Sequence, residues 1–209
     1  APPYGTVTFN QLVVDGGQLD TGYDGVVELF GEMVVSNTGA IFYNDNTADR
    51  GYRVSSKLSG SGPIEFHGYT QAAYVSNYVY GLNIAGTNNT FNGPWNVVIG
   101  TLVAAAPGCL GTNGITIGAQ GAIEAAYGIN NSNATLTLNG KFLLHGNHAF
   151  KNVIINGNSL ANGHYTYAQL AANFPGNFPA TWAQQFGSTV STASGSISVG
   201  LPPLLPPVT

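Results

Sequence analysis

The sequence predicts an all-β chain built as a solenoid of the β-helix type, and two observations carry this prediction. Short apolar strands recur in pairs with a glycine between them, as in NVVIGTLVA (96–104), ITIGAQGAI (115–123) and LTLNGKFLL (136–144). The glycines of these units follow one another at intervals of 22, 23, 38, 21 and 19 residues. A period near 20 residues with such short strands is typical of stacked coils. The glycines concerned are Gly17, Gly39, Gly62, Gly100, Gly121 and Gly140.

Each of these strands is too short to be stable alone, but a stacked coil finds hydrogen-bond partners above and below it. Glycine suits the corners of such a coil because it accepts positive φ without strain. We therefore expect about six to eight coils, with the six glycines at or near equivalent corners. The long interval contains a weaker unit around Gly86. A globular β-sandwich, which also has regularly spaced strands and turns, is the alternative.

The charge content supports stacking and excludes one class of partner. Charged residues make up 7% of the 209 residues, against about 25% in an average soluble domain. Stacked coils place like residues over like residues, so repeated charges would repel one another. With five Lys and Arg residues and a net charge of −4, the chain lacks the basic face that nucleic-acid binding requires. The one cysteine, Cys109, can form no internal disulfide and is expected as a small buried residue.

The chain divides into coils, a capping module and a tail. We expect coils over residues 1–146, with an irregular, tyrosine-rich insertion at 61–95, and a capping module at 147–199. Within the module, TYAQLAANF predicts one short helix, because Thr166 and Gln169 have capping-box spacing and Pro175 ends the segment. Residues 200–209 form a proline-rich apolar tail. The aromatic residues expected to cover the end of the solenoid are Phe174, Phe178, Trp182 and Phe186.

Two further features of the sequence bear on location. The chain begins APPYG without a methionine, as a processed chain would. It has no run of about 18 apolar residues, so no transmembrane segment is expected. These features favour a secreted protein, located outside the cell or on its surface.

Residues 90–199 resemble the autotransporter-associated β-strand repeat proteins of bacteria, the pertactin-like passenger class. The resemblance lies in NTFNGPWNVVIGTLVAAAPGCLGTNGITIGAQGAIEA, in ATLTLNGKFLLHGNHAFKNVIING, and in a closing module from YTYAQLAANF to GSISV. It implies a right-handed parallel β-helix on the outside of a bacterium. It implies no enzymatic activity, because these repeats are scaffolds.

Other β-helices serve as polysaccharide lyases and hydrolases, and each of these activities requires a particular group of side chains. A lyase needs a base beside carboxylates, and only NDNTADRGYR brings both together, with Asp45, Asp49, Arg50 and Arg53. A solvated loop with local ion pairs explains this segment better, so we expect no activity that depends on Asp49, Arg50 or Arg53. A glycosidase needs two facing carboxylates. The candidate pairs are Glu28 with Glu32 and Glu65 with Glu124.

Metal sites have weak support in the sequence. Asp15, Asp20 and Asp24 lack the spacing of known calcium loops, and turns that these side chains stabilise explain them equally well. His145, His148 and His164 lack the spacing of a zinc site. We therefore assign no catalytic residue, no metal ligand and no cofactor.

Two groups of residues are candidates for binding. Aromatic rings beside Asn and Gln suit stacking on sugars, which makes the tyrosines of the insertion candidate glycan contacts: Tyr69, Tyr74, Tyr78 and Tyr80. The stiff apolar tail suits docking on a neighbouring subunit. Its candidate subunit contacts are Leu201, Leu204, Leu205 and Val208.

The sequence thus favours a non-enzymatic, secreted structural solenoid. We expect copies to join head to tail into an extracellular filament or surface layer, because such contacts do not close. A glycan-binding adhesin module, with cell-surface or environmental glycans as partners, is the first alternative. A carbohydrate-active β-helix enzyme is the second.

Overall fold

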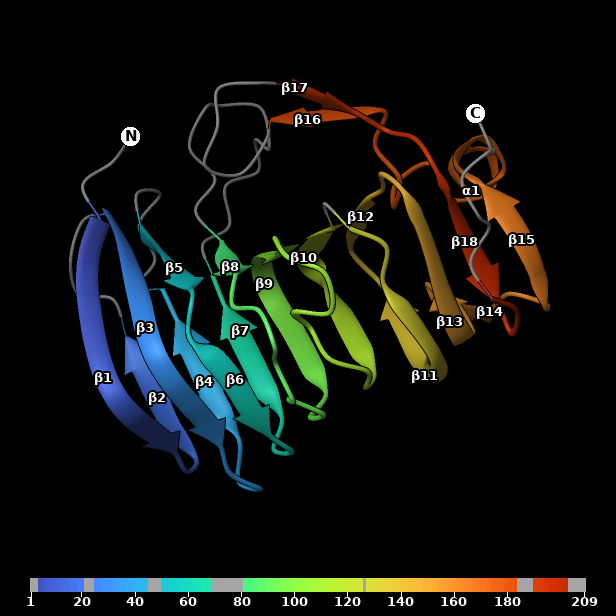
Figure 1. Ribbon diagram of the computed structural model, residues 1–209. Coiled ribbons are helices and arrows are strands. Elements are labelled where there is room, and N and C mark those ends of the chain that lie inside the picture. Colours follow the sequence, from blue (N-terminus) through green and yellow to red (C-terminus); the bar gives the residue numbers. More distant parts are fainter. Residues whose placement is uncertain are drawn as a thin grey trace, which may run out of the picture.

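The computed structural model describes residues 4–20, 25–44, 50–68, 81–125, 127–183 and 190–202. These residues form a parallel β-solenoid of about six turns, which confirms the predicted fold class. Figure 1 shows the strands side by side in chain order, from β1 at the N-terminal end to β13 near the C-terminal end. The Tyr69, Tyr74, Tyr78 and Tyr80 cluster lies outside the described residues, as do Leu204, Leu205 and Val208.

Each turn contributes to three parallel sheets, which we name faces A, B and C. The long strands bend from one face to the next, and their register shifts at the bends. Face A contains the first halves of β1 (Tyr4–Val14) and β3 (Gly25–Val35), then β5 (Arg50–Val54), β8 (Leu82–Ile84), the second halves of β9 (Trp95–Ala104) and β10 (Ile115–Ala125), and β12 (Lys141–Leu143).

Faces B and C complete the turn. Face B contains the second halves of β1 and β3, β6 (Lys57–Gly60), the first halves of β11 (Asn130–Leu138) and β13 (Asn147–Ile155), and β18 (Ser196–Val199). Face C contains β2 (Gly17–Asp20), β4 (Ala40–Tyr43), β7 (Ile64–His67), the first halves of β9 and β10, and the second halves of β11 and β13.

The core is built from columns of apolar side chains, one residue from each turn. In one column on face C, every residue pairs in register with the next and is at most 3% exposed. The column consists of Ala40, Ile64, Trp95, Ile115, Leu136 and Val153. Cys109 is also buried, at 2% exposure, as predicted from the sequence. The alternation of apolar and polar residues therefore places the apolar set inside every turn.

The recurring glycines occupy two corners, so the prediction of one set of equivalent corners is wrong. Gly17 starts β2 opposite Ala40, and Gly39 and Gly62 lie one and two residues before the face C strands of the next two turns. Gly100 pairs with Gly121 at the corner between faces C and A, and Gly140 follows them there. The interval of 38 residues between Gly62 and Gly100 is the change from one corner to the other. Gly86 lies at the third corner, where its N–H donates to Val54.

Two described ion pairs of the wall join residues of opposite charge in adjacent turns. Glu28 is in register with Arg53, and their side chains meet at 3.0 Å. Glu32 is in register with Lys57, at 3.5 Å. Stacking tolerates these charges because each one lies next to its opposite.

Regular coils are also present in the ranges predicted as the irregular insertion, 61–95, and as the capping module, 147–199. Both β7 and β8, which lie within the range 61–95, pair with neighbouring turns. The strand β13, at the start of the range 147–199, pairs with β11 over faces B and C. The regular coils therefore reach Ile155.

A mixed set of elements covers the C-terminal end. The strands β14 (Asn158–Ser159) and β15 (Gly163–Thr166) run antiparallel to the last strands of faces C and B. The predicted helix is present as α1 (Tyr167–Asn173), with a capping box between Thr166 and Gln169, and its Leu170 is buried in the core. In the part of the chain that is described, no helix is long and apolar enough to cross a membrane.

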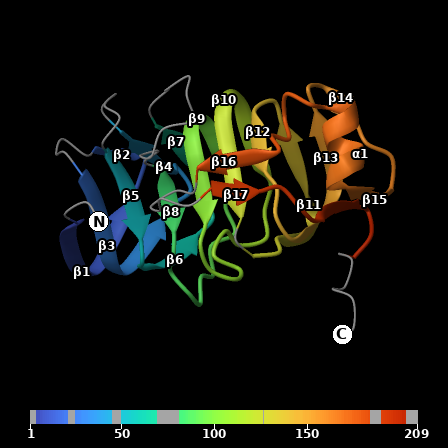
Figure 2. The same ribbon diagram turned by 90° about the horizontal axis from the view of Figure 1, so that it is seen from above.

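The aromatic residues of the cap act in two places, which extends the predicted role. Phe178 stacks on Phe142 in the last turn, at a ring distance of 6.5 Å, and so covers the end. Trp182 belongs to the hairpin of β16 (Thr181–Ala183) and β17 (Val190–Thr192), which folds back along the side of the solenoid. Figure 2 shows this hairpin crossing over β9 and β10. Phe186 lies outside the described residues.

We predict that Gly140→Ala destabilises the fold by about 1–3 kcal/mol, the usual cost of overpacking. A Cβ at position 140 would lie 2.1 Å from the carbonyl oxygen of Gly121 in the preceding turn. The matched control is Gly176→Ala, where a Cβ has no atom within 4 Å. Denaturant unfolding measures both changes. Equal stability of the two variants would contradict the stacked-corner account.

Candidate functional site

The carboxylates that the sequence offered for catalysis serve contacts between turns. Glu28 accepts a hydrogen bond from Ser55 at 2.6 Å in addition to its ion pair with Arg53. Glu32 lies on face B and pairs with Lys57. The structure therefore gives Glu28 and Glu32 separate partners and does not combine them in one site. Asp45 and Asp49 lie outside the described residues, as does the side chain of Arg50.

The second carboxylate pair is also divided. Glu65 lies on face C, where its two oxygens contact the Nε2 atom of His67 and the amide of Asn96. Glu124 lies on face A, three turns further along, and accepts a hydrogen bond of 2.8 Å from the indole N–H of Trp182. Glu65 and Glu124 are thus on different faces, and the two-carboxylate arrangement of a glycosidase is not formed by them.

The aspartates predicted as a weak calcium motif show one defined role. Asp15 accepts hydrogen bonds from the hydroxyls of Ser36 and Thr38, which belong to the turn above it. These two hydrogen bonds lower the pKa of the Asp15 carboxyl. Asp20 ends β2, and Asp24 lies outside the described residues. Asp15 therefore links two corners, as a turn-stabilising side chain does.

The three histidines do not converge. His164 contacts the hydroxyl of Ser198 in the cap at 2.8 Å, whereas His145 and His148 lie in the last turn. Both ring nitrogens of His148 are used inside the protein. Nδ1 accepts from the backbone N–H of Ile129 at 3.1 Å, and Nε2 contacts the carbonyl of His145 at 3.0 Å. Within the described ranges, no group of three His, Cys, Asp or Glu side chains is placed to hold a metal ion.

His148 is a buried neutral base. Its side chain is completely buried, and this burial lowers the pKa of His148 to about 4. Its hydrogen bonds fit the tautomer with the proton on Nε2, because Nδ1 is the acceptor. Burial also lowers the pKa of His145, whose ring contacts Trp182 at 5.5 Å. His148 therefore holds the corner between two turns and is not available as a ligand.

A cluster under the β16–β17 hairpin was missed by sequence reasoning. Glu124 is 5% exposed, although its side chain points outward from face A. Its neighbours in register, Val103 and Leu143, are buried as well. The hairpin covers this side, with Trp182 bonded to Glu124 and His145 at 3.8 Å from the same carboxylate oxygen. Sequence patterns could not show this contact because its partners are 58 residues apart.

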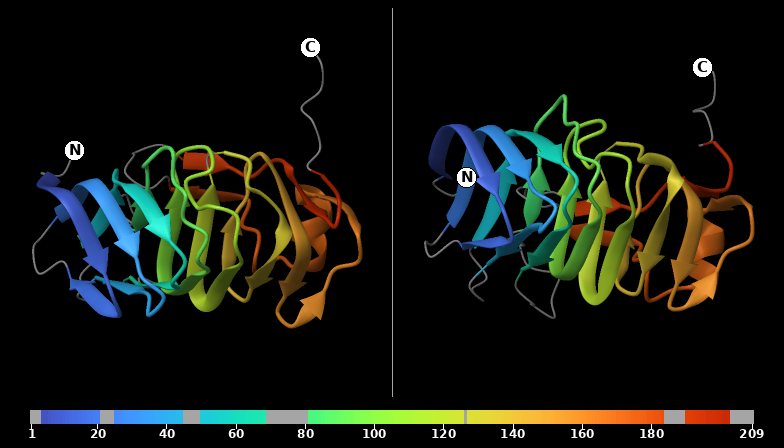
Figure 3. Two further views of the ribbon diagram at one scale, coloured as in Figure 1. Left: turned by 60° about the horizontal axis from the view of Figure 1, so that its bottom comes forward. Right: turned by 90° about the horizontal axis from the view of Figure 1, so that it is seen from below.

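Among the described residues, no strand or helix covers the outer side of β1 at the N-terminal end, whereas β15 and α1 cover the C-terminal end. Val7 and Val13 of β1 are 49% and 57% exposed, and Phe30 of β3 is 37% exposed. Val7 is in register with the buried Leu29, so it belongs to a core column that ends at the surface. Figure 3 shows β1 at one end of the solenoid and the cap at the other. We call Val7 and the outer side of β1 the open end.

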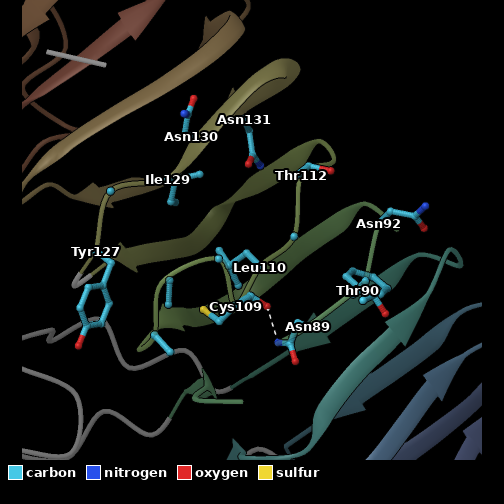
Figure 4. A pocket seen from close by; sticks show the side chains of 16 residues that line it. Asn89, Thr90, Asn92, Cys109, Leu110, Thr112, Tyr127, Ile129, Asn130 and Asn131 are labelled. Carbon is cyan, nitrogen blue, oxygen red and sulfur yellow. Dashed lines mark hydrogen bonds between the residues drawn. The ribbon is translucent and has the colours of Figure 1, made fainter. Parts of the chain in front are cut away.

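A cleft of about 430 Å³ lies on face B. It forms where residues 105–113 make turns in place of a strand, between residues 89–92 and 129–131. Figure 4 shows Ile129 and Asn131 above Leu110 and Cys109, with Tyr127 at one end and Thr112 at the other. We call this feature the face B cleft. The sequence signal was AAAPGCLGTNG, in which Pro and Gly interrupt the strand pattern.

Asparagine side chains hold the walls of the face B cleft in place of a backbone ladder. Asn89 accepts from the N–H of Leu58 and donates to the carbonyl of Cys109, both at 2.8 Å. Asn131 donates to the carbonyl of Asn113 at 2.9 Å. The indole of Trp95 donates to the carbonyl of Leu110 at 2.7 Å. The cleft therefore has fixed walls even though regular pairing stops there.

Comparison with protein-family models, with curated proteins and with solved structures gives no match. The resemblance of residues 90–199 to the autotransporter-associated repeats stays a prediction.

We predict that acid destabilises the fold through His148. The unfolded chain protonates this histidine near its ordinary pKa of 6.5, whereas the folded protein does so near 4. Between these values the unfolded state binds more protons, so lowering the pH favours unfolding. Between these two pKa values the free energy of unfolding falls by at most about 1.4 kcal/mol for each pH unit of acidification. Above pH 6.5 His148 is neutral in both states, so it causes no such loss there.

The measurement compares the pH dependence of the unfolding free energy in wild type and His148→Gln. We expect a smaller slope for the variant. The imidazole NMR signal of His148 gives a second readout in the wild-type protein. A titration near the ordinary histidine pKa would refute the buried neutral form.

We predict that Trp182→Phe destabilises the protein by about 1–3 kcal/mol, because the buried Glu124 loses a hydrogen-bond donor. Unfolding by denaturant measures the change. Glu124→Leu provides the control background, since Leu143 is its neighbour in register. In that background the cost of Trp182→Phe should be smaller, as a double-mutant cycle measures. Additive effects of the two substitutions would contradict the contact.

Proposed function

We propose that this chain is a non-enzymatic structural scaffold that associates with a second copy through its open end. The observation that carries the proposal is the difference between the two ends. Core columns reach the surface at Val7, which is 49% exposed, whereas Leu170 of α1 closes the other end at 1% exposure. A solenoid end with exposed core and unpaired backbone groups normally requires a cover.

The chemistry of β1 favours pairing with another strand. The strand is 11 residues long, and its sequence YGTVTFNQLVV has no charged residue and no proline. The register of β1 shifts once, between Thr8 and Gln11, but the strand lacks the lysine or proline with which proteins usually protect an edge that could bind further strands. Val7 and Phe30 add apolar surface beside this edge. These features suit a β-sheet contact more than a small-molecule site.

Contact between two open ends explains the asymmetry of the chain better than head-to-tail stacking. A twofold axis brings two β1 strands together in opposite directions, which forms an antiparallel ladder and closes the assembly. At the C-terminal end, β15 and α1 already cover the last turn. The alternative is a head-to-tail filament in which the tail, residues 200–209, docks on the neighbouring subunit. Of the tail's candidate contact residues, Leu201 is described, and it is half-buried.

The absence of enzymatic activity is part of the proposal. Among the described residues, the acidic side chains of Glu28 and Glu65 contact neighbouring turns, Glu28 through Arg53 and Glu65 through Asn96. Secretion and an extracellular surface location are proposed on the sequence features alone. A glycan-binding role is the second candidate, and the face B cleft supports it.

We predict that Val7→Lys abolishes self-association. The lysine places a charge at the centre of the open end, while the half-exposed position limits the cost to the monomer. The matched control is Val98→Lys, because Val98 is 37% exposed on β9, away from the ends. Light scattering over a concentration series measures the mass. Wild type and Val98→Lys should form dimers, and Val7→Lys should stay monomeric with unchanged circular dichroism.

Two results would overturn the proposal. A wild-type protein that remains monomeric at all concentrations excludes association through the open end. A mass that grows without limit, with long particles in electron micrographs, indicates the head-to-tail filament in place of the closed dimer.

A further inference from the structure

We propose that the face B cleft binds a neutral oligosaccharide. The inference rests on glycan binding, the second candidate function, and concerns a different surface from the open end, so it does not depend on the proposed association. It assigns a binding site to a segment, residues 105–113, that breaks the regular solenoid. The argument rests on the charge, the shape and the hydrogen-bonding groups of the cleft.

The charge of the lining restricts the ligand to neutral molecules. The cleft is lined by 16 residues, and none of them is Asp, Glu, Lys, Arg or His. Phosphates, uronates and metal ions are usually held in proteins by charged side chains, since an unpaired charge is costly to desolvate. The lining includes Cys109, but this residue is buried and its burial raises the pKa of the thiol, which disfavours the thiolate that binds metal. A ligand of this cleft therefore carries its polarity in hydroxyl or amide groups.

The distribution of apolar and polar groups matches a sugar. The floor is apolar and buried, with Phe91 and Cys109 at 2% exposure and Ile129 at 7%. The exposed rim offers hydroxyls and amides, such as those of Thr112 and Asn92. A pyranose ring has an apolar face of C–H groups and an edge of hydroxyls, so it fits a site with both kinds of surface.

Tyr127 supplies the aromatic platform. Its side chain is 45% exposed at one end of the cleft, as Figure 4 shows. An exposed tyrosine offers a large rigid apolar face with a polar tip, which is the group that stacks on sugar rings. Its neighbour Gly128 also lines the cleft and has no side chain, so the backbone beside the tyrosine is accessible from the cleft. No hydrogen bond to another described side chain engages its hydroxyl.

The cleft is formed before a ligand arrives. The carbonyls of Cys109, Leu110 and Asn113 are held by side-chain hydrogen bonds of 2.7–2.9 Å. A volume of about 430 Å³ is within the usual range for small-molecule sites. Rigid walls reduce the entropy lost on binding, which favours affinity for a ligand of matching shape.

We predict that one or more neutral hexasaccharides bind, whereas the hexamer of galacturonic acid does not. The neutral probes are the hexamers of cellulose, xylan, mannan, starch and laminarin. Isothermal titration calorimetry measures affinity, and amide NMR shifts locate the site. Shifts should concentrate at residues 108–112 and 127–131. Tyr127→Ala should weaken binding by about tenfold, and Tyr127→Phe should keep most of it, because the ring makes the contact.

The control variant is Tyr43→Ala, which removes a tyrosine from face C and should leave affinity unchanged. Three outcomes would overturn the inference: none of the neutral probes binds at millimolar concentrations, binding shifts amides elsewhere, or Tyr127→Ala binds as wild type does. Preferential binding of the galacturonic acid hexamer would also overturn it. Unfolding curves of each variant establish that the fold is kept.

Discussion

The structure depends on the parallel, in-register stacking of one turn on the next. Strands such as β3, β9 and β10 pair with strands of both neighbouring turns, so every position must suit the same position in the next turn. Apolar residues meet this requirement by stacking on one another in the columns of the core. Gly121 and Gly140 satisfy it where the carbonyl of one turn leaves no room for a Cβ in the next. Glu28 and Arg53 satisfy it as opposite charges, which explains why so few charges are present.

Asparagine preserves the stacking where strands stop. An amide side chain carries one acceptor and two donor positions, so it can replace a peptide group in a ladder. Asn89 does this across three successive turns, from Leu58 to Cys109. Asn131 does the same for Asn113. Both asparagines therefore bond to backbone groups of adjoining turns. Backbone groups around the face B cleft thereby find partners without a strand.

The fold was predictable because its signal is local and repeated. Paired strands, glycine spacing and the capping box of Thr166 are all readable within short windows. The corner assignment failed between Gly62 and Gly100, because spacing alone does not identify which corner a glycine occupies. The contact of Trp182 with Glu124 was not readable for a different reason. It depends on a hairpin folding back over face A, which no periodic pattern encodes.

The same constraint indicates where function should lie. The polar side chains inside the repeat are hydrogen-bonded to neighbouring residues. Asp15 accepts hydrogen bonds from Ser36 and Thr38, and the two ring nitrogens of His148 contact the backbone of Ile129 and His145. Their polar atoms are therefore poorly placed to serve a ligand. The repeat is interrupted at β1, which lacks a partner strand on its outer side among the described residues, and at residues 105–113, where turns replace a strand. At these two places side chains and backbone groups face solvent, and binding can occur there without breaking the stack.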